Sequence, residues 1–419
     1  MLSSRNEVTV SIAAELHPRS VKSMAMAVLI GISICHMLND MLQVLLLAVY
    51  PLLKGGFHLN FAQIGLITLV YQATGSFLQP LIGISTDARP KPALLPAGMA
   101  FSMSGIIIVA MAQSYSRLLI GAAMLGVGSA IFHPESSRIV RLASGGRFGF
   151  AQSVFQVGGS FGQSLGPLLA AFFILPRGRE SMAWFSIIAM GAIALLSALS
   201  VWSHRHVDGG SRFRHHERTR DELPRRHVAI ALTLLATLVM SKFFYLASIN
   251  SYYIFYLMQR FHLPAYSAQL ALFVFLAAAA VGTMAGGPIG DRIGRRAVIQ
   301  VSVLGVLPFT LVLPYVDLEV TIVLSVVIGL ILSSAFAAIV VYATELMPHR
   351  IGAVSGLFFG LAFGMAGVGA AGLGLVADWS SITMVYRICA FLPVFGLAAL
   401  FLPEPPRAIS PVAFDAVAE

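Results

Sequence analysis

The stretch Gly287-Pro-Ile-Gly-Asp291-Arg-Ile-Gly-Arg-Arg296 separates two long apolar runs. Its glycines permit a tight turn, and its arginines suit the anionic headgroups at a membrane surface. A related stretch, Gly83-Ile-Ser-Thr-Asp87, lies 204 residues earlier. A second pair, Arg147-Phe-Gly149 and Arg350-Ile-Gly352, repeats at an offset of 203 residues. Two independent matches at nearly the same offset indicate a duplicated chain with two similar halves.

The composition places both halves in a membrane. Of the 419 residues, 58% are hydrophobic and 11% are charged, against about 45–50% and about 25% in soluble domains. A spanning helix needs about 20 apolar residues. Such runs cover 25–50, 61–84, 93–113, 117–137, 148–174, 181–202, 228–257, 266–290, 297–315, 319–343, 351–376 and 382–402. The sequence therefore predicts an all-α membrane protein of twelve transmembrane helices in two pseudo-symmetric six-helix bundles.

The predicted domains are a tail at 1–24, an N-terminal bundle at 25–203, a linker at 204–227, a C-terminal bundle at 228–403 and a tail at 404–419. Positively charged loops stay cytoplasmic. With both termini inside, 20 of the 27 Lys and Arg residues lie in cytoplasmic segments and five in outer loops. We therefore expect a multi-pass protein of a bacterial inner membrane with both termini cytoplasmic. This topology also explains the net charge of +9 without nucleic acid as a partner.

The first apolar run carries polar side chains on one helix face. His36, Asn39, Asp40 and Gln43 have the i, i+3, i+4, i+7 spacing of such a face. A lone charge at the centre of a membrane helix costs about 2.5–3.5 kcal/mol, so Asp40 is expected to meet water, a partner or a substrate. We expect Asp40 and His36 to carry a coupling proton, and Asn39 and Gln43 to contact the substrate. A neutral His36 bonded between helices is the structural alternative.

The seventh run, equivalent to the first in the duplicated plan, carries an amine. Lys242 follows Asp40 by 202 residues, so the two groups are expected at similar depth on facing helices. We expect Lys242 to attract an anionic ligand or to exchange partners with Asp40, beside aromatic residues of the same run: Tyr245, Tyr252, Tyr253 and Tyr256. The alternative is a permanent structural ion pair between Asp40 and Lys242.

The fifth run combines a stripe of small residues with a polar face. Gly158, Gly162 and Gly166 repeat every fourth residue and permit close approach of another helix, and Pro167 loosens the backbone there. Gln152 and Gln156 lie on a different face, which is expected to line a wet cavity and contact the substrate because polar groups are costly against lipid. Generic helix packing is the alternative explanation of the glycines.

Charged residues near the ends of other runs suggest gating. Glu135 and Arg138 are three residues apart, so they either pair with each other or serve proton entry and gating. In the loop before the ninth run we assign gating to Gly287, Asp291, Arg292, Gly294, Arg295 and Arg296. Asp87 is the equivalent acid in the first half, where Asp87-Ala-Arg-Pro-Lys91 has proline in place of a glycine.

Several of these stretches resemble those of a known family. The Gly287–Arg296 loop resembles the loop signature of the major facilitator superfamily, and Gly158–Pro167 resembles the signature of its proton-coupled antiporters. Phe132–Arg138 and Phe155–Gly159 resemble stretches of members that export antibiotics. The resemblance implies export of a small anionic drug, a phosphonate, in exchange for protons by alternating access. The partners would be the anionic drug, protons and the lipid bilayer, and we expect a monomer without a cofactor.

Other classes find little support in the sequence. It contains no Gly-x-x-x-x-Gly-Lys-Ser/Thr loop and no His-Glu-x-x-His set, so neither ATP-driven transport, an enzyme nor a metal site is expected. Cys35 and Cys389 lie far apart in separate apolar runs, which argues against a disulfide. Two alternatives stay open: a proton symporter that imports a small anionic metabolite, and a non-transporting membrane sensor. The direction of flux separates the first, and a sensor would not need buried Asp40 and Lys242.

Overall fold

The computed structural model describes residues 24–88, 91–145, 147–207, 224–347 and 351–403. The N-terminal half contains α1 (Met26–Ala48), α2 (Tyr50–Gly56), α3 (Phe61–Ala88), α4 (Leu94–Ala110), α5 (Tyr115–Ala143), α6 (Phe148–Leu169), a π-helical turn η1 (Ala170–Ile174), α7 (Leu175–Arg177), a 3-10 segment η2 (Arg179–Trp184) and α8 (Phe185–Val207). The C-terminal half contains α9 (Arg225–Phe261), α10 (Ala265–Ile293), α11 (Arg295–Gly305), α12 (Leu307–Val312), η3 (Leu313–Tyr315), α13 (Leu318–Ser333), α14 (Ala335–Leu346), α15 (Ile351–Trp379), α16 (Ile382–Ala390) and η5 (Leu392–Phe401).

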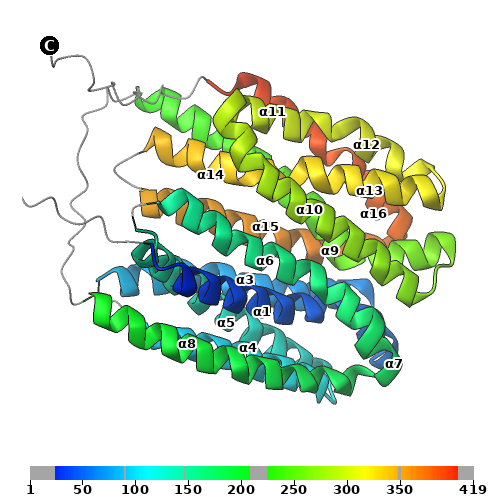
Figure 1. The fold of residues 1–419 in the computed structure, drawn as a ribbon. Coiled ribbons are helices and arrows are strands. Elements are labelled where there is room, and N and C mark those ends of the chain that lie inside the picture. Colours follow the sequence, from blue (N-terminus) through cyan, green and yellow to red (C-terminus); the bar gives the residue numbers. More distant parts are fainter. Residues whose placement is uncertain (1–23, 89–90, 146, 208–223, 348–350, 404–419) are drawn as a thin grey trace, which may run out of the picture.

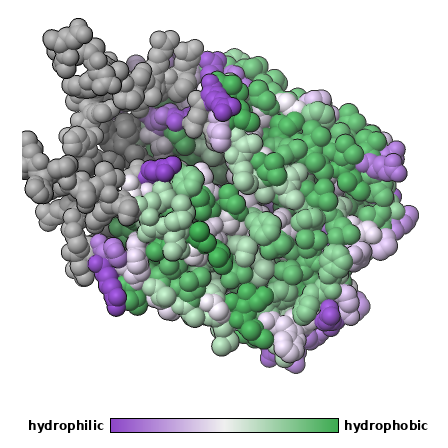
Figure 2. Space-filling view, viewed as in Figure 1, coloured by the Kyte–Doolittle hydropathy of each residue, from purple (hydrophilic) through white to green (hydrophobic). Residues whose placement is uncertain are grey.

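These elements form the spans expected from the apolar runs. Eleven helical stretches within the described ranges are long and apolar enough to cross a membrane, and α4 is a shorter apolar helix of 17 residues. In the view of Figure 2 the middle of the molecule is mostly hydrophobic, and hydrophilic residues gather towards its ends. The all-α membrane fold is therefore confirmed.

Both ends of the predicted linker, 204–227, are helical in the structure. Helix α8 continues to Val207 and α9 begins at Arg225, so helices extend into the linker from both sides. The segment 208–223 and the predicted tails, apart from Met24 of the first, lie outside the described residues.

The two halves lie side by side with their helices running along a common direction (Figure 1). Helices α3 and α15, and helices α6 and α10, form the main contacts between the halves. We call the end where α3 begins at Phe61 and α15 ends at Trp379 the distal end. The proximal end is the one where α1 begins at Met26. In Figure 1 the distal end is on the right, where α7 is labelled.

Helices α3 and α15 pack tightly at the distal end and separate towards the proximal end. A Cβ atom added at Gly65 of α3 would lie 2.7 Å from the Tyr252 hydroxyl, and one at Gly374 of α15 would lie 2.6 Å from the same atom. Near the middle, Ser76 still donates a hydrogen bond of 2.7 Å to the Gly360 carbonyl. Closer to the proximal end, a Cβ at Gly83 or at Gly356 would meet no atom within 4 Å. The interface between the halves is therefore closed distally along this helix pair.

Candidate functional site

Asp40 lies at the centre of a buried polar cluster in the N-terminal half. Its carboxylate accepts hydrogen bonds from the side-chain amides of Gln163 at 2.9 Å and Asn39 at 3.3 Å. His36 Nε2 lies 3.5 Å from Asp40 Oδ2, and His133 Nε2 lies 3.8 Å from Oδ1. Asp40 is only 5% exposed. Helices α1, α5 and α6 thus converge on one carboxylate.

Both histidines have their second ring nitrogen fixed to a backbone carbonyl. His36 Nδ1 donates to the Phe155 carbonyl at 2.8 Å, and His133 Nδ1 donates to the Ser129 carbonyl at 2.9 Å. A neutral histidine held in this way presents the lone pair of Nε2. Here both Nε2 lone pairs would face the Asp40 carboxylate, which when ionised can only accept hydrogen bonds. A cation between the Nε2 atoms and the carboxylate is therefore favoured. The cluster is therefore built to hold a positive charge, of which a proton is the simplest.

The glycine stripe of α6 brings this cluster together. A Cβ at Gly158 or Gly162 would collide with the backbone of Ser33 or Met37 on α1, and one at Gly166 would lie 2.6 Å from Val44. The predicted close approach at these glycines is therefore present, and its partner is α1.

Two further features of α6 concern its contact with α1 and the residue at which it ends. The ring of His36 stacks on Phe155 of α6 with centroids 4.0 Å apart. Pro167 lies two residues before the end of α6, and the π-helical turn η1 follows at once. The regular helix therefore ends just beyond the stripe, as the loosened backbone at Pro167 predicts.

Lys242 lies in the other half and does not meet Asp40. Lys242 is 3% exposed, and its Nζ lies 5.5 Å and 5.8 Å from the ring centroids of Phe336 and Phe243. Among the described residues no carboxylate lies within ion-pair distance of this amine, whereas the partners of Asp40 all belong to the N-terminal half. A permanent Asp40–Lys242 ion pair is therefore wrong for this conformation. The reason is that each charge is enclosed by side chains of its own half.

The tyrosines of α9 are all buried, but they have different surroundings. Tyr252 donates its hydroxyl to the Ala370 carbonyl and lies 3.4 Å from the Phe61 carbonyl, so it belongs to the distal closure. Tyr256 stacks on Tyr386 with centroids 4.0 Å apart, and its hydroxyl has no hydrogen-bond partner within the described part of the chain. The Tyr253 ring lies 6.4 Å from the same Tyr386 ring. Tyr245, 2% exposed, lies closest to Lys242 along the helix.

The remaining polar residues of α1 and α6 surround the cluster. Asn39 accepts a hydrogen bond from Ser102 at 3.2 Å, and Gln43 accepts one from Tyr71. Gln152 and Gln156 are half-buried, while Gln163 is exposed although it binds the buried Asp40. The exposed Gln163 amide thus forms the edge of the cluster.

Glu135 and Arg138 form the pair that their spacing allows. Arg138 Nε lies 3.9 Å from Glu135 Oε2, and an Arg138 guanidinium nitrogen donates to Thr86 of α3 at 3.3 Å. Glu135 is 1% exposed. The ion pair within α5 is thus observed, and a role of Glu135 in proton entry stays a prediction.

The loop between α10 and α11 is as tight as its glycines suggest. Gly294 alone separates the two helices and has φ of +91°, a conformation that L side chains rarely adopt. Arg295 forms an ion pair with Glu345 of α14, and Arg296 donates to the Leu400 carbonyl at 3.4 Å. Arg292 is exposed. The side chains of Asp87 and Asp291 and the surroundings of Gly287 lie outside the described part, so their gating role stays a prediction.

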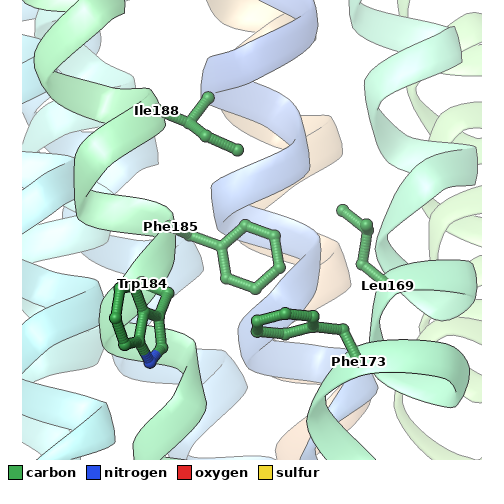
Figure 3. A pocket seen from close by; sticks show the side chains of 5 residues that line it. All are labelled: Leu169, Phe173, Trp184, Phe185 and Ile188. Atoms are coloured by element: carbon green, nitrogen blue, oxygen red, sulfur yellow. The ribbon is translucent and has the colours of Figure 1, made fainter.

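A separate apolar pocket lies between α8 and the distal part of the fifth span. It has a volume of about 240 Å³ and is lined by Leu169, Phe173, Trp184, Phe185 and Ile188 (Figure 3). None of the predicted site residues contributes to it. None of these side chains carries a charge.

Three residues take positions that their spacing did not predict. His133 joins Asp40 from α5, and Gln163, which shares the predicted polar face of α6 with Gln152 and Gln156, binds Asp40 directly. The ligand atoms of His36, Asp40 and His133 lie within 4.8 Å of one another, a grouping that a search for local motifs does not detect. Asp378, the third, contacts α3. For His133, the sequence offered one signal: His133-Pro134-Glu135 places two titratable groups within an apolar run.

Comparison with known proteins identifies close relatives. The chain is 56% identical over 377 residues to the fosmidomycin resistance protein of Escherichia coli (strain K12), covering 89% of this chain and 92% of that protein. It is 39% identical over 403 residues to the uncharacterized MFS-type transporter YfnC of Bacillus subtilis (strain 168), covering 94% and 98%.

Solved structures show the same fold. A mutant of the nucleoside transporter NupG matches with a TM-score of 0.69 at 13% identity, over 90% of this chain and 100% of that chain. A bacterial homologue of the human lysosomal transporter Spinster, solved inward-facing and unoccupied, matches with a TM-score of 0.68 at 15% identity, over 91% and 95%. The family model of the Major Facilitator Superfamily matches residues 32–268 and 235–416. The chain therefore belongs to the major facilitator superfamily and is a membrane transporter.

Proposed function

We propose that this transporter is a proton-coupled antiporter that exports small anionic drugs such as fosmidomycin across the bacterial inner membrane by alternating access. The observation that carries the proposal is the separation of two buried charges. Asp40, with two histidines, lies in one half, and Lys242 lies in the other without a carboxylate partner among the described residues. One group suits a proton and the other suits an anion.

The proton site is Asp40 with His36, and His133 completes it. Two imidazole Nε2 atoms and a carboxylate compete for a proton within 4.8 Å, so a small change of surroundings can move that proton. His133 also lies at the border of the halves, with its ring centroid 6.5 Å from that of Phe363 on α15. A rocking motion of the halves would therefore change the surroundings of this cluster. Glu135 is the candidate for proton transfer between this cluster and the proximal side.

Lys242 is the proposed anion site. A buried amine without a counter-ion is costly, and an anionic ligand would offset that cost. Tyr245, Tyr253 and Tyr256 on the same helix could donate hydroxyl hydrogens to phosphonate oxygens, while the N-terminal half would face the ligand with its amide side chains: Asn39, Gln43, Gln152 and Gln156. The name of the 56% identical relative supports fosmidomycin, an anionic phosphonate, as the first drug to test.

Exchange follows from the direction of transport. Resistance requires the drug to leave the cell, whereas the proton gradient of a bacterial membrane points inward. Export powered by that gradient must therefore move the proton opposite to the drug. Both termini are proposed to be cytoplasmic, so the closed distal end would be the outer one and this conformation would face inward. A monomer would suffice, because both groups lie in one chain.

Symport of a small anionic metabolite is the second candidate. A protonated Asp40 cluster attracts an anion electrostatically, which favours carrying both ligands in the same direction. The fate of a labelled anion in cells distinguishes the two. An antiporter lowers its accumulation, and a symporter raises it.

The test is fosmidomycin accumulation in cells that express the protein, with and without a proton uncoupler, beside an unrelated cationic dye. We expect expression to lower the drug content, the uncoupler to restore it, and the dye to be unaffected. A drug content that expression raises would favour the symporter. A content that expression leaves unchanged would reject export of fosmidomycin.

A further inference from the structure

The N-terminus of α3 is capped by the opposite half of the molecule. Asp378, in the last turns of α15, accepts hydrogen bonds from the backbone N–H groups of Phe61 at 2.8 Å and of Ala62 at 2.7 Å. Each carboxylate oxygen takes one of the two bonds. Helix α3 belongs to the N-terminal bundle and α15 to the C-terminal bundle, so one side chain connects the two.

This contact uses donors that α3 cannot satisfy itself. Asn60 and Gln63 form a reciprocal capping box, in which Gln63 N–H donates to Asn60 Oδ1 at 2.8 Å and Asn60 N–H donates to Gln63 Oε1 at 3.0 Å. The first amides of the helix, Phe61 and Ala62, have no acceptor within their own turn. Asp378 supplies it, and its charge also gains from the positive end of the helix dipole.

Other contacts close the same end around this cap. The ring of Phe61 packs edge-on against Phe255 of α9 with centroids 5.3 Å apart. The hydroxyl of Thr68 of α3 lies 3.3 Å from that of Ser251 of α9. The side-chain amide of Gln269 of α10 donates to the Ala48 carbonyl of α1. These contacts are apolar or between neutral groups, and Asp378 adds a charged one.

We propose that Asp378 is the latch of the distal gate, a residue that holds this end of the transporter closed and sets the balance between its two conformations. The proposal rests on alternating access as proposed above. Opening the distal end separates α3 from α15, which breaks both bonds at once and leaves two amides of α3 without their acceptor. The closed state is therefore favoured by the latch, and removing it shifts the balance towards the open state.

The test is the labelling rate of a thiol hidden by the closed gate. Thr68 is 2% exposed, and the substitution Thr68→Cys places a reporter thiol beneath the latch. The substitution Cys389→Ala removes one natural thiol, and the natural Cys35, buried within the N-terminal half, stays as an internal control for unfolding. Purified protein is treated with a bulky maleimide, and the labelling of each thiol is measured by peptide mass spectrometry.

We expect Asp378→Asn to speed labelling of the reporter thiol by roughly tenfold, because Asn offers one acceptor oxygen and loses the charge–dipole attraction. Labelling of Cys35 should stay slow. The matched control is Asp317→Asn, which removes an aspartate cap that lies within one half, where Asp317 Oδ1 accepts from Val320 N–H at 3.0 Å. This control should change the rate at the reporter by less than about twofold, since no contact between the halves is lost.

Three outcomes would reject the latch: an unchanged rate in Asp378→Asn, an equal increase in Asp317→Asn, or an equal increase at Cys35. The measurement needs neither drug nor proton gradient. A failed latch therefore leaves proton-coupled export untouched, and failed export leaves the labelling result valid.

Discussion

The two halves of this transporter hold their buried charges in opposite ways. In the N-terminal half, Asp40 is surrounded by two histidines and two amides, and both histidines are fixed by further hydrogen bonds. In the C-terminal half, Lys242 lies beside aromatic rings and has no carboxylate partner among the described residues. The halves share a duplicated backbone plan, but their polar chemistry has diverged.

Under the proposed function, this difference is a division of labour between the two halves. A carboxylate with preset partners can take up and release a proton with little rearrangement, because its donors are already in place. An amine without a counter-ion is available to bind an anionic ligand. The proposed functional difference between the halves fails if either Asp40 or Lys242 has only a structural role. Four substitution experiments test this, from the largest expected effect to the smallest.

The largest effect is expected for Asp40→Asn. Asparagine keeps the size of Asp40 but cannot exchange a proton, so drug-driven proton movement in proteoliposomes should fall to the level of empty liposomes. Glu180→Gln is the control, because Glu180 is exposed and pairs with its neighbour Arg179. Unchanged proton movement in Asp40→Asn would reject Asp40 as the coupling group.

Lys242→Gln should weaken binding of the drug without abolishing proton movement. Loss of a charge-assisted hydrogen bond of about 1.5–3 kcal/mol corresponds to roughly tenfold to hundredfold weaker binding. The drug concentration that gives half-maximal proton movement should rise accordingly, and Lys242→Arg should retain part of the affinity because it keeps the charge. If Lys242→Gln binds the drug like the natural protein, the anion binds elsewhere and the comparison of the halves fails.

Gly162→Ala and Gly356→Ala compare two glycines on equivalent helices. A Cβ at Gly162 collides with Met37, so we expect a loss of about 1–3 kcal/mol in stability from overpacking. A Cβ at Gly356 meets no atom within 4 Å, so its effect should stay within about 0.5 kcal/mol. Thermal unfolding in detergent measures both. Equal losses would mean that the open proximal end of α15 is not a feature of the resting protein.

The smallest effect is expected for Tyr252→Phe. Its hydroxyl is engaged in the distal closure, so its removal should cost about 0.5–1.5 kcal/mol of stability and leave drug affinity within about twofold. Tyr256→Phe is the informative partner, because that hydroxyl has no hydrogen-bond partner within the described residues and is one of the proposed donors to the drug. A larger loss of affinity in Tyr252→Phe than in Tyr256→Phe would place the substrate at the contact of α9 with α3 and α15.

Features that depend on one helix were predictable from the sequence. The length and composition of the apolar runs determined the spans, and the offset repeats determined the two halves. The 3.6-residue period placed His36, Asn39, Asp40 and Gln43 on one face, which the structure buries together. The small-residue spacing of α6 predicted a close neighbour, because only helices without bulky side chains can approach so closely.

Features that depend on how helices meet were decided by the tertiary structure. His133 and Gln163 reach Asp40 from other helices, Asp378 caps a helix 316 residues away from it, and Lys242 stays apart from Asp40. Periodicity gives the face of a helix but neither its neighbour nor its axial shift, so such contacts cannot be read from spacing. The conformation also decides them, since α3 and α15 pack tightly at the distal end and separate towards the proximal end.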